Sequence, residues 1–374
     1  MKANFKHYRP VTILIVLLLF AAGAGASHDQ EARKTLTREF AADRNTQLEM
    51  SNRYGKIEIK TWDKPLVKMT STVIVKASSK SKAEDRLNQI QTEMAKSGNN
   101  IRAVTTIAEN NSSWWSGWWG GGSGTTMEIN YEVYMPADVP SIIENKYGNI
   151  YLQDLSGKTS LNLKYGNLYA GDINNDLLLE IGYGKATVGE TKNLSGTLSY
   201  SDYIGKKAGM VILTTKYSKV QLDEIAGITA NSKYDTYKLG TAGSVTMTGS
   251  YDDVSLTSLQ KGKFTAKYTN LSLGSIGQSL EADIDYGSLQ VENLKAGFTN
   301  MTVNTDYAPV KIRGAVPCRV EISGKYFDAD LGQDFIVKDK VSEGSSKRIS
   351  GFKMSQRASA TITIESRYGD VTIK

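Results

Sequence analysis

Apolar residues recur in this chain with two superimposed periods. Over short stretches they alternate with polar residues, as around Leu179 and Ile181, which is typical of a half-buried β-strand. Over longer stretches a tyrosine returns every 17 to 21 residues. The eleven members of this series are Tyr147, Tyr165, Tyr183, Tyr200, Tyr217, Tyr234, Tyr251, Tyr268, Tyr286, Tyr307 and Tyr326.

The third, fifth and eighth residues after each tyrosine of the series share one character. Over ten intervals, 28 of these 30 positions are apolar, where the overall content of 40% would give 12. The two exceptions are Gly205 and Thr191. These positions therefore define a core register, and each repeat is expected to hold two or three short strands with corners at the small or polar residues after the tyrosine.

A single repeat of this length cannot enclose a core, whereas stacked repeats bury a continuous one. We therefore predict an all-β fold, a single-stranded parallel β-solenoid with coils of about 17 to 18 residues, over residues 136–374. A β-propeller is disfavoured because its blades need about 40 residues. The tyrosines are expected to form a ladder of stacked rings along one corner. A packing role is the favoured interpretation of this ladder, and an aromatic ligand-binding stripe is the alternative.

Residues 36–135 lack the repeat and are predicted to form an N-terminal α/β cap. The patterns indicate strands at Gln47–Met50, Lys56–Thr61 and Leu66–Lys76. They also indicate an amphipathic helix over Lys82–Lys96 with Ser81 as its N-cap. Its apolar face consists of Ala83, Leu87, Ile90 and Met94. The tyrosine signature occurs once in this region, at Tyr54, and again at Tyr368. The 42 residues between Tyr326 and Tyr368 predict an insertion in the final coil.

The first 26 residues have the pattern of a secretory signal peptide. Lys2, Lys6 and Arg9 precede an apolar run that ends in small residues before Ala26. We expect export to the periplasm, the outer cell surface or the medium, with an uncleaved membrane anchor as the alternative. Without this segment the formal net charge falls from +6 to +3, because the segment holds three cationic residues and no acidic one. Nucleic acid is therefore not an expected partner.

The chain offers little material for catalysis. His7, His28 and Cys318 are its only histidines and cysteine, which disfavours a Cys/His zinc site, a disulfide framework and a histidine-based catalytic dyad. The acidic clusters at Asp252-Asp253 and Asn174-Asn175-Asp176 are attributed to turn chemistry. We predict no catalytic, cofactor-binding or metal-binding residue and do not expect an enzyme. A polysaccharide-active enzyme is the least favoured alternative, because uniform short coils leave no loops to wall a cleft.

Two further features suggest binding surfaces. A Trp/Gly-rich loop at 112–124 contains Trp114, Trp115, Trp118 and Trp119, which could contact sugar rings or a membrane interface, although folding back over a solenoid end is the favoured interpretation. A lysine precedes six of the eleven tyrosines, at Lys146, Lys164, Lys216, Lys233, Lys267 and Lys325. This row is interpreted first as a solvated face, and second as a basic stripe for acidic polysaccharide or lipopolysaccharide.

The segment Tyr134-Met135-Pro136-Ala137-Asp138-Val139, followed by Lys146-Tyr147-Gly148-Asn149-Ile150 and successive tyrosine-glycine coils, resembles the bacterial "putative adhesin" family DUF4097, which is close to DUF2807. The resemblance covers residues 40–374. It implies a right-handed parallel β-helix that is exported and non-enzymatic and that binds through its surface. The expected partner is an unidentified surface glycan or envelope protein. A scaffold that self-associates through the solenoid ends, similar to bactofilins, is the alternative.

Overall fold

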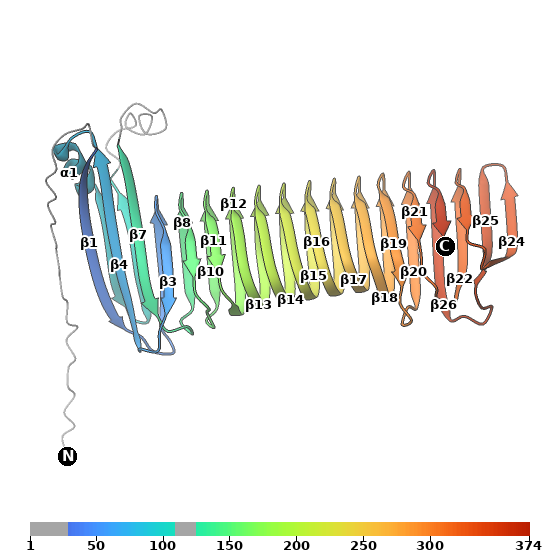
Figure 1. Cartoon of the computed structure of the whole chain (residues 1–374), viewed down its shortest axis with the longest axis horizontal. Coiled ribbons are helices and arrows are strands. Elements are labelled where there is room, and N and C mark those ends of the chain that lie inside the picture. The colour runs from blue at the N-terminus through green and yellow to red at the C-terminus, as the bar shows by residue number, and fades with distance from the viewer. Residues whose placement is uncertain (1–28, 109–124) are drawn as a thin grey trace, which may run out of the picture. The chain divides into compact units, whose positions relative to one another are not determined.

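The computed structural model describes residues 29–108 and 125–374, and this part of the chain consists of 27 strands and one helix (Figure 1). The predicted signal peptide and the four tryptophans of the 112–124 loop lie outside the described residues. The chain divides into an N-terminal unit that ends at Asp176 and a C-terminal unit that begins at Leu177. Parallel pairing joins the coils within each unit, and the predicted β-solenoid is confirmed.

The N-terminal unit combines an antiparallel sheet with the first solenoid coils. Its elements are β1 (Gln30–Ala41), β2 (Gln47–Arg53), β3 (Ile57–Thr61), β4 (Leu66–Ala77), α1 (Lys80–Asn88), β5 (Ile90–Ser97), β6 (Asn100–Ile107), β7 (Thr126–Met135), β8 (Ser141–Lys146), β9 (Ile150–Leu152), β10 (Thr159–Lys164) and β11 (Asn167–Ala170). Strand β4 pairs antiparallel with β1 and β7, whereas β2 and β3 pair in parallel with β8 and β9. The solenoid register therefore already includes the coil around Tyr54.

The predicted helix over Lys82–Lys96 is wrong in its second half. Helix α1 ends at Asn88, and Ile90 and Met94 belong to β5, which forms an antiparallel hairpin with β6. Both residues are buried on one face of β5, because a spacing of four fits a strand as well as a helix. Gly98, at a φ of 57°, lies in the hairpin turn between β5 and β6, and this turn favours a strand over a helix for Ile90 and Met94. The N-cap is Ser79 rather than Ser81, with its Oγ accepting from the Lys82 amide at 3.4 Å.

Strand β12 (Ile173–Gly182) leads into the C-terminal unit, whose central coils are nearly identical. They are β13 (Lys185–Ser199), β14 (Asp202–Lys216), β15 (Lys219–Lys233), β16 (Thr236–Ser250), β17 (Asp253–Lys267) and β18 (Asn270–Asp285). Consecutive strands pair in parallel, so that Val220 lies beside Tyr237 and Tyr237 beside Val254. All three side chains are buried, as the core register predicts.

The closing coils do not stack in sequence order. Their strands are β19 (Ser288–Leu294), β20 (Asn300–Asp306), β21 (Val310–Ile312), β22 (Cys318–Lys325), β23 (Ala329–Leu331), β24 (Phe335–Glu343), β25 (Ser346–Lys353), β26 (Ala360–Arg367) and β27 (Val371–Ile373). Strand β26 lies between β20 and β22, and β27 lies between β21 and β23 (Figure 1). The predicted insertion is the antiparallel hairpin β24–β25, which pairs with β22. The last coil of the sequence thus fills a gap left by the preceding ones.

Two predictions from the sequence stay predictions. The domain boundary at residue 136 is one of them, because the compact units divide at Asp176 while solenoid register begins at β2. The other is export by the first 26 residues. Within residues 29–108 and 125–374, no helix has the length and apolar character needed to span a membrane.

Candidate functional site

The ladder tyrosines occupy a backbone conformation that side chains other than glycine seldom adopt. Thirteen tyrosines, from Tyr54 to Tyr368, have φ between 51° and 62°, and Met354 is the one other non-glycine residue with positive φ in the described part of the chain. A left-handed residue costs about 1–2 kcal/mol. Because this cost is repeated in every coil, each tyrosine must supply an interaction that offsets it.

Stacking between rings supplies that interaction. In the C-terminal unit, successive rings from Tyr183 to Tyr307 lie 4.7–5.1 Å apart between centroids and are tilted by 2–18°. Tyr368 lies between Tyr307 and Tyr326, at 4.6 and 4.9 Å, so the ladder follows the spatial order of the coils. In the N-terminal unit, Tyr147 stacks on Tyr54 at 5.2 Å and on Tyr165 at 5.0 Å. Each stacked pair contributes about 0.5–1.5 kcal/mol.

Packing uses only part of each ring. The ladder tyrosines that are exposed in the C-terminal unit keep between 40% and 60% of their surface in contact with solvent. Their stacked faces are covered by neighbouring rings, so the surface left open is a continuous line of ring edges and hydroxyl groups. Tyrosine presents both apolar and polar atoms at such a line, which is the property that suits it to interfaces.

Lysines beside the ladder fall into two groups. The ammonium groups of Lys216 and Lys233 lie 5.3 and 5.4 Å from the ring centroids of the following tyrosines. Lys267 occupies the same position in its coil, but its ammonium group pairs with the Asp285 carboxylate at 3.3 Å. Lys216 and Lys233 are register partners, and neither has an ion-pair partner among the described residues. The sequence row of lysines thus contains one unneutralised pair in these central coils.

An open groove of about 340 Å³ includes this pair in its lining. Its lining comes from three consecutive coils, β14, β15 and β16, and consists of Thr214, Thr215, Lys216, Asn231, Ser232, Lys233, Thr248, Gly249 and Ser250. The side chains that reach solvent carry hydroxyl, amide or ammonium groups, and none is acidic or apolar. The groove and the ladder together form what we call the tyrosine–lysine stripe, defined by Tyr217, Tyr234, Lys216, Lys233 and the groove lining.

A second column, inside the wall, lies directly after the tyrosines. Its side chains are buried and belong to Ser201, Ser218, Asp235, Asp252 and Thr269. Each side-chain oxygen accepts the backbone N–H of the equivalent residue one coil earlier, at 2.6 to 3.3 Å. This ladder satisfies amide groups that the corner removes from the sheet. Sequence reasoning saw Asp252 only as a turn residue, although the polar residue after each of the five tyrosines from Tyr200 to Tyr268 was the available signal.

The two aspartates of this column have a structural role. The Thr215 hydroxyl donates to Asp235 at 2.6 Å, and the Ser232 hydroxyl donates to Asp252 at 2.7 Å. A Cβ on Gly249 would collide with the Asp252 carboxylate, so glycine makes room for it. Burial raises the pKa of both aspartates above the ordinary value of 3.8. At 3% and 2% exposure these carboxylates do not reach a substrate.

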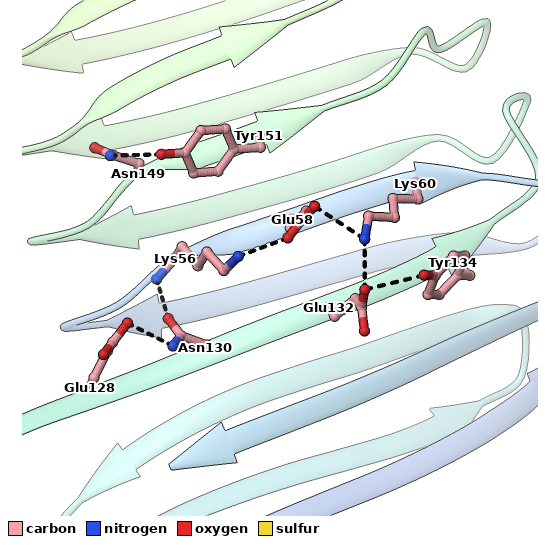
Figure 2. Close-up of polar contacts among 9 residues, drawn as sticks. All are labelled: Lys56, Glu58, Lys60, Glu128, Asn130, Glu132, Tyr134, Asn149 and Tyr151. Atoms are coloured by element: carbon pink, nitrogen blue, oxygen red, sulfur yellow. Dashed lines mark hydrogen bonds and ion pairs between the residues drawn. The ribbon is translucent and has the colours of Figure 1, made fainter. Parts of the chain in front are cut away.

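A third polar surface lies on the N-terminal unit, across β3, β7 and β9 (Figure 2). The Lys60 ammonium lies 2.7 Å from Glu132 and 3.2 Å from Glu58, and Lys56 lies 2.8 Å from Glu58. The Lys56 bond holds the pKa of Glu58 below its usual range, and the Lys60 bond does the same for Glu132. Tyr134 also donates to Glu132, at 3.2 Å. Both carboxylates are therefore ionised and held by lysine, which does not suit an acid–base pair.

Aromatic side chains flank this ion-pair cluster. The Tyr151 hydroxyl accepts from Asn149 at 3.1 Å (Figure 2). Its ring stacks on Tyr169 with 5.3 Å between centroids. Trp62 lies 5.4 Å from Tyr134, tilted by 34°. Sequence reasoning missed Tyr151 and Tyr169 because they repeat the 18-residue coil spacing only once, and it missed Trp62 because that residue is not part of a repeat. They form a mixed aromatic and charged face on which every drawn charge already has a partner.

A larger open groove, of about 600 Å³, crosses β15 to β19 and is also polar. Residues at the fourth and sixth positions after each tyrosine line it, among them Gln221, Asp223, Lys238 and Glu292. Within the described residues, no three His, Cys, Asp or Glu side chains are grouped so that they could hold a metal ion. The tyrosine–lysine stripe is thus the surface in which unpaired charge, aromatic rings and a groove coincide.

No family model matches the chain, and no curated protein matches it. Several solved structures are similar. A "putative cell adhesion protein" from Clostridium sporogenes is 9% identical with a TM-score of 0.17, and the match covers 91% of this chain and 99% of that one. A "putative lipid binding protein" from Parabacteroides distasonis is 11% identical over 75% and 93% of the two chains, with a TM-score of 0.32. A "putative adhesin" from Bacteroides fragilis is 13% identical over 62% and 96%, with a TM-score of 0.28.

Proposed function

We propose that this protein is an exported, non-enzymatic cell-envelope or secreted protein that acts in adhesion by binding a ligand along its solenoid wall. One observation carries the proposal: the ladder tyrosines repeat a costly backbone conformation in every coil and still leave 40% to 60% of each C-terminal ring exposed. Fully buried rings would stabilise the fold more, because stabilisation grows with the apolar area removed from water. An exposed, regularly spaced aromatic line is instead a surface for recognition.

The carboxylates support binding rather than catalysis. Asp235 and Asp252 are enclosed and accept hydrogen bonds from the wall itself. Glu58 and Glu132 are neutralised by lysine. Polysaccharide cleavage needs a free acid and a free base or nucleophile across a bond, whereas these four carboxylates are already engaged in hydrogen bonds or ion pairs of the fold. Incubation of the mature protein with a panel of polysaccharides should release no reducing ends, and any turnover would revive the enzyme alternative.

The proposed export rests on the first 26 residues, which have the pattern of a signal peptide. The proposed role in adhesion rests also on the resemblance to the DUF4097 family. The expected ligand is a surface glycan or an envelope protein, and nucleic acid is not expected at a mature net charge near +3, the whole chain carrying +6.

The test compares cell binding of the mature protein, residues 27–374, with that of two variants. In the first, Tyr200, Tyr217 and Tyr234 are replaced by asparagine, which tolerates the left-handed conformation. In the matched control, the exposed Met210 and Ile212 are replaced by serine. Loss of binding to envelope fractions in the first variant alone supports the proposal, and equal binding by all three proteins contradicts it. In a third variant the four loop tryptophans are replaced by serine. Loss of binding in that variant alone would assign binding to the 112–124 loop instead.

A scaffold that self-associates is the second candidate, and the outer strand β24 favours it. Among the described strands, β24 pairs only with β25, and it exposes Ile336, Val337 and Val341. Such an edge can add a strand from another chain. However, Lys338 and Lys340 and the register shift near Val337 are features that discourage edge pairing. Sedimentation across a hundredfold concentration range should give a monomer, and reversible filaments would favour the scaffold.

A further inference from the structure

We propose that β14 and β15 form a binding site for an acidic polysaccharide, whose carboxylate or sulfate groups bind between Lys216 and Lys233 while its hydroxyl groups lie along the adjoining groove. The inference rests on the proposed function and names the ligand class of the tyrosine–lysine stripe.

The ammonium groups of Lys216 and Lys233 repel each other, and no ion pair among the described residues offsets this cost. Lys216 and Lys233 are direct register partners on neighbouring parallel strands. Like charges placed opposite each other on a sheet are destabilising. At two other places in the same unit neighbouring coils put opposite charges together, since Lys207 pairs with Glu224 at 3.0 Å and Lys263 with Glu281 at 2.8 Å. An anion placed between the two ammonium groups would remove the repulsion that remains at Lys216 and Lys233.

Contacts with aromatic rings hold the ammonium groups of Lys216 and Lys233 in place. Each ammonium lies over the ring of its own tyrosine, at 5.3 Å for Lys216 and 5.4 Å for Lys233. The rings are stacked 4.8 Å apart and tilted by only 3°. Two positive charges therefore repeat at about the spacing of the coils, roughly 4.8 Å. A polymer with regularly spaced anions matches such a pair better than a single small anion does.

Side chains that can form hydrogen bonds line the groove. Thr214, Asn231 and Thr248 are exposed on three successive strands and line it beside the lysines. Hydroxyl and amide groups can donate to and accept from sugar hydroxyls. The groove, of about 340 Å³, is open to solvent and can therefore admit part of an extended polymer. Each exposed lining side chain carries a hydroxyl, amide or ammonium group, so a hydrated glycan can form hydrogen bonds there that lipid chains cannot.

The positive region is local. In the lysine column, the coils on either side of the pair carry Ser199 and Ser250, and the next lysine, Lys267, is neutralised by Asp285. The column then continues with Asp285 and Asp306, and its next like-charged partners, Arg367 and Lys325 in the closing coils, do not line the groove. The groove and the two lysines coincide only in the central coils, which makes Lys267 a matched control at the same position of the repeat.

The experiment measures binding of the mature protein to polygalacturonate and to heparin by calorimetry at 50 and 200 mM salt. Polygalacturonate presents only carboxylates, and heparin adds sulfates, so the two probes separate the anion types. We expect K216Q/K233Q to bind at least tenfold more weakly and to show a shallower dependence on salt, since fewer counterions are released. We expect K267Q to bind within twofold of the unchanged protein. All three lysines are exposed, and circular dichroism verifies that each variant is folded.

Several outcomes would overturn the proposal. They are absence of binding to both polymers, equal losses in K267Q and K216Q/K233Q, or tighter lysine-dependent binding to vesicles of phosphatidylglycerol than to either polymer. The proposed adhesion is judged separately. If the protein binds cells but neither polymer, the acidic-polysaccharide site fails and adhesion stands. If it binds the polymers through Lys216 and Lys233 but binds no cells or envelope fractions, adhesion fails and the site stands.

Discussion

The central coils and the closing coils of the C-terminal unit solve the same stacking problem in different ways. From β13 to β18 each strand pairs with its neighbours in sequence, and equivalent residues are mostly 17 positions apart. From β20 to β27 the order changes, because β26 enters between β20 and β22. The central coils are related by translation and can exchange roles. The last coil has a unique place that no other segment can fill.

This difference separates two parts of stability. In a solenoid, each coil contributes mainly through contacts with its neighbours. A central coil can be lost if the remaining ones close up in register. The closing coil has partners on both sides that are joined to each other by the chain between β21 and β22, so its removal leaves two unpaired surfaces.

The largest effect is expected from removing the closing coil. Deletion of residues 360–374 removes Ile362, Ile364, Val371 and Ile373, all buried. Their burial amounts to about 6–12 kcal/mol. The variant should lose protection of β20 and β22 in hydrogen exchange and should aggregate through the freed edges. Unchanged exchange in β20 would show that β22 can move into the gap, and the comparison would then fail.

Deletion of one central coil should cost much less. Removing residues 234–250 takes out 17 residues and joins Lys233 to Tyr251, so the next tyrosine keeps its spacing. Asp252 would then stand where Asp235 stood and could accept from the Ser218 amide. We expect a folded protein with one cooperative unfolding transition and slightly lower stability. A molten or aggregated product would mean that the central coils are not interchangeable.

The sequence predicted the central coils well, because one structural position is copied there as one residue type. The buried third position after each tyrosine follows directly from alternation and spacing. The order of the closing coils could not be read in this way. Tyr326 and Tyr368 carry the same signature, and nothing local to either indicates that Tyr368 stacks on Tyr307. Pairing over 61 residues is a non-local choice, set by which stacked arrangement buries both strand edges.

The candidate site was predictable in its components but not in its grouping. The sequence showed six lysines before tyrosines, and from it they are equivalent. The predicted stacking places Lys216 beside Lys233, but only the structure shows that Lys267 forms an ion pair with Asp285 and that the groove includes Lys216 and Lys233. The left-handed tyrosines were also missed, since such positions usually favour glycine or asparagine and stacking overrides that preference here.

Single substitutions test the left-handed positions in the two regions. Tyr234 stacks on rings at 4.8 Å on both sides, so Y234A should lose about 1–3 kcal/mol. Y234G should lose less, because glycine avoids the left-handed cost. In the closing coils Met354 has a φ of 62° and an exposed side chain, so M354G should stabilise by up to about 1 kcal/mol. Denaturant unfolding measures all three, and a Y234G less stable than Y234A would contradict the strain.

The smallest expected effect is a difference in pH response between the two regions. Burial raises the pKa of Asp235 and Asp252, so their folded forms hold protons more tightly than their unfolded forms. Their contribution to stability therefore falls as pH rises above 3.8 through the raised pKa. In the closing coils the Lys347 bond lowers the pKa of Asp328, so its contribution is present above 3.8 and is lost as pH falls through the lowered pKa.

Hydrogen exchange at pH 6 and at about pH 3, corrected for the intrinsic rate, should therefore show opposite trends. Protection should be slightly greater in the central coils and slightly less in β24 and β25 at the lower pH. The variant D235S provides the control, because serine already occupies this column at Ser201 and Ser218 and accepts the same kind of hydrogen bond without a charge. The thermal midpoint of D235S relative to the unchanged protein should rise between pH 4 and pH 7. If the difference in thermal midpoint stays constant, solvent or compensating hydrogen bonds already offset the cost of burying the Asp235 carboxylate. The pH response of the central coils would then not come from this column.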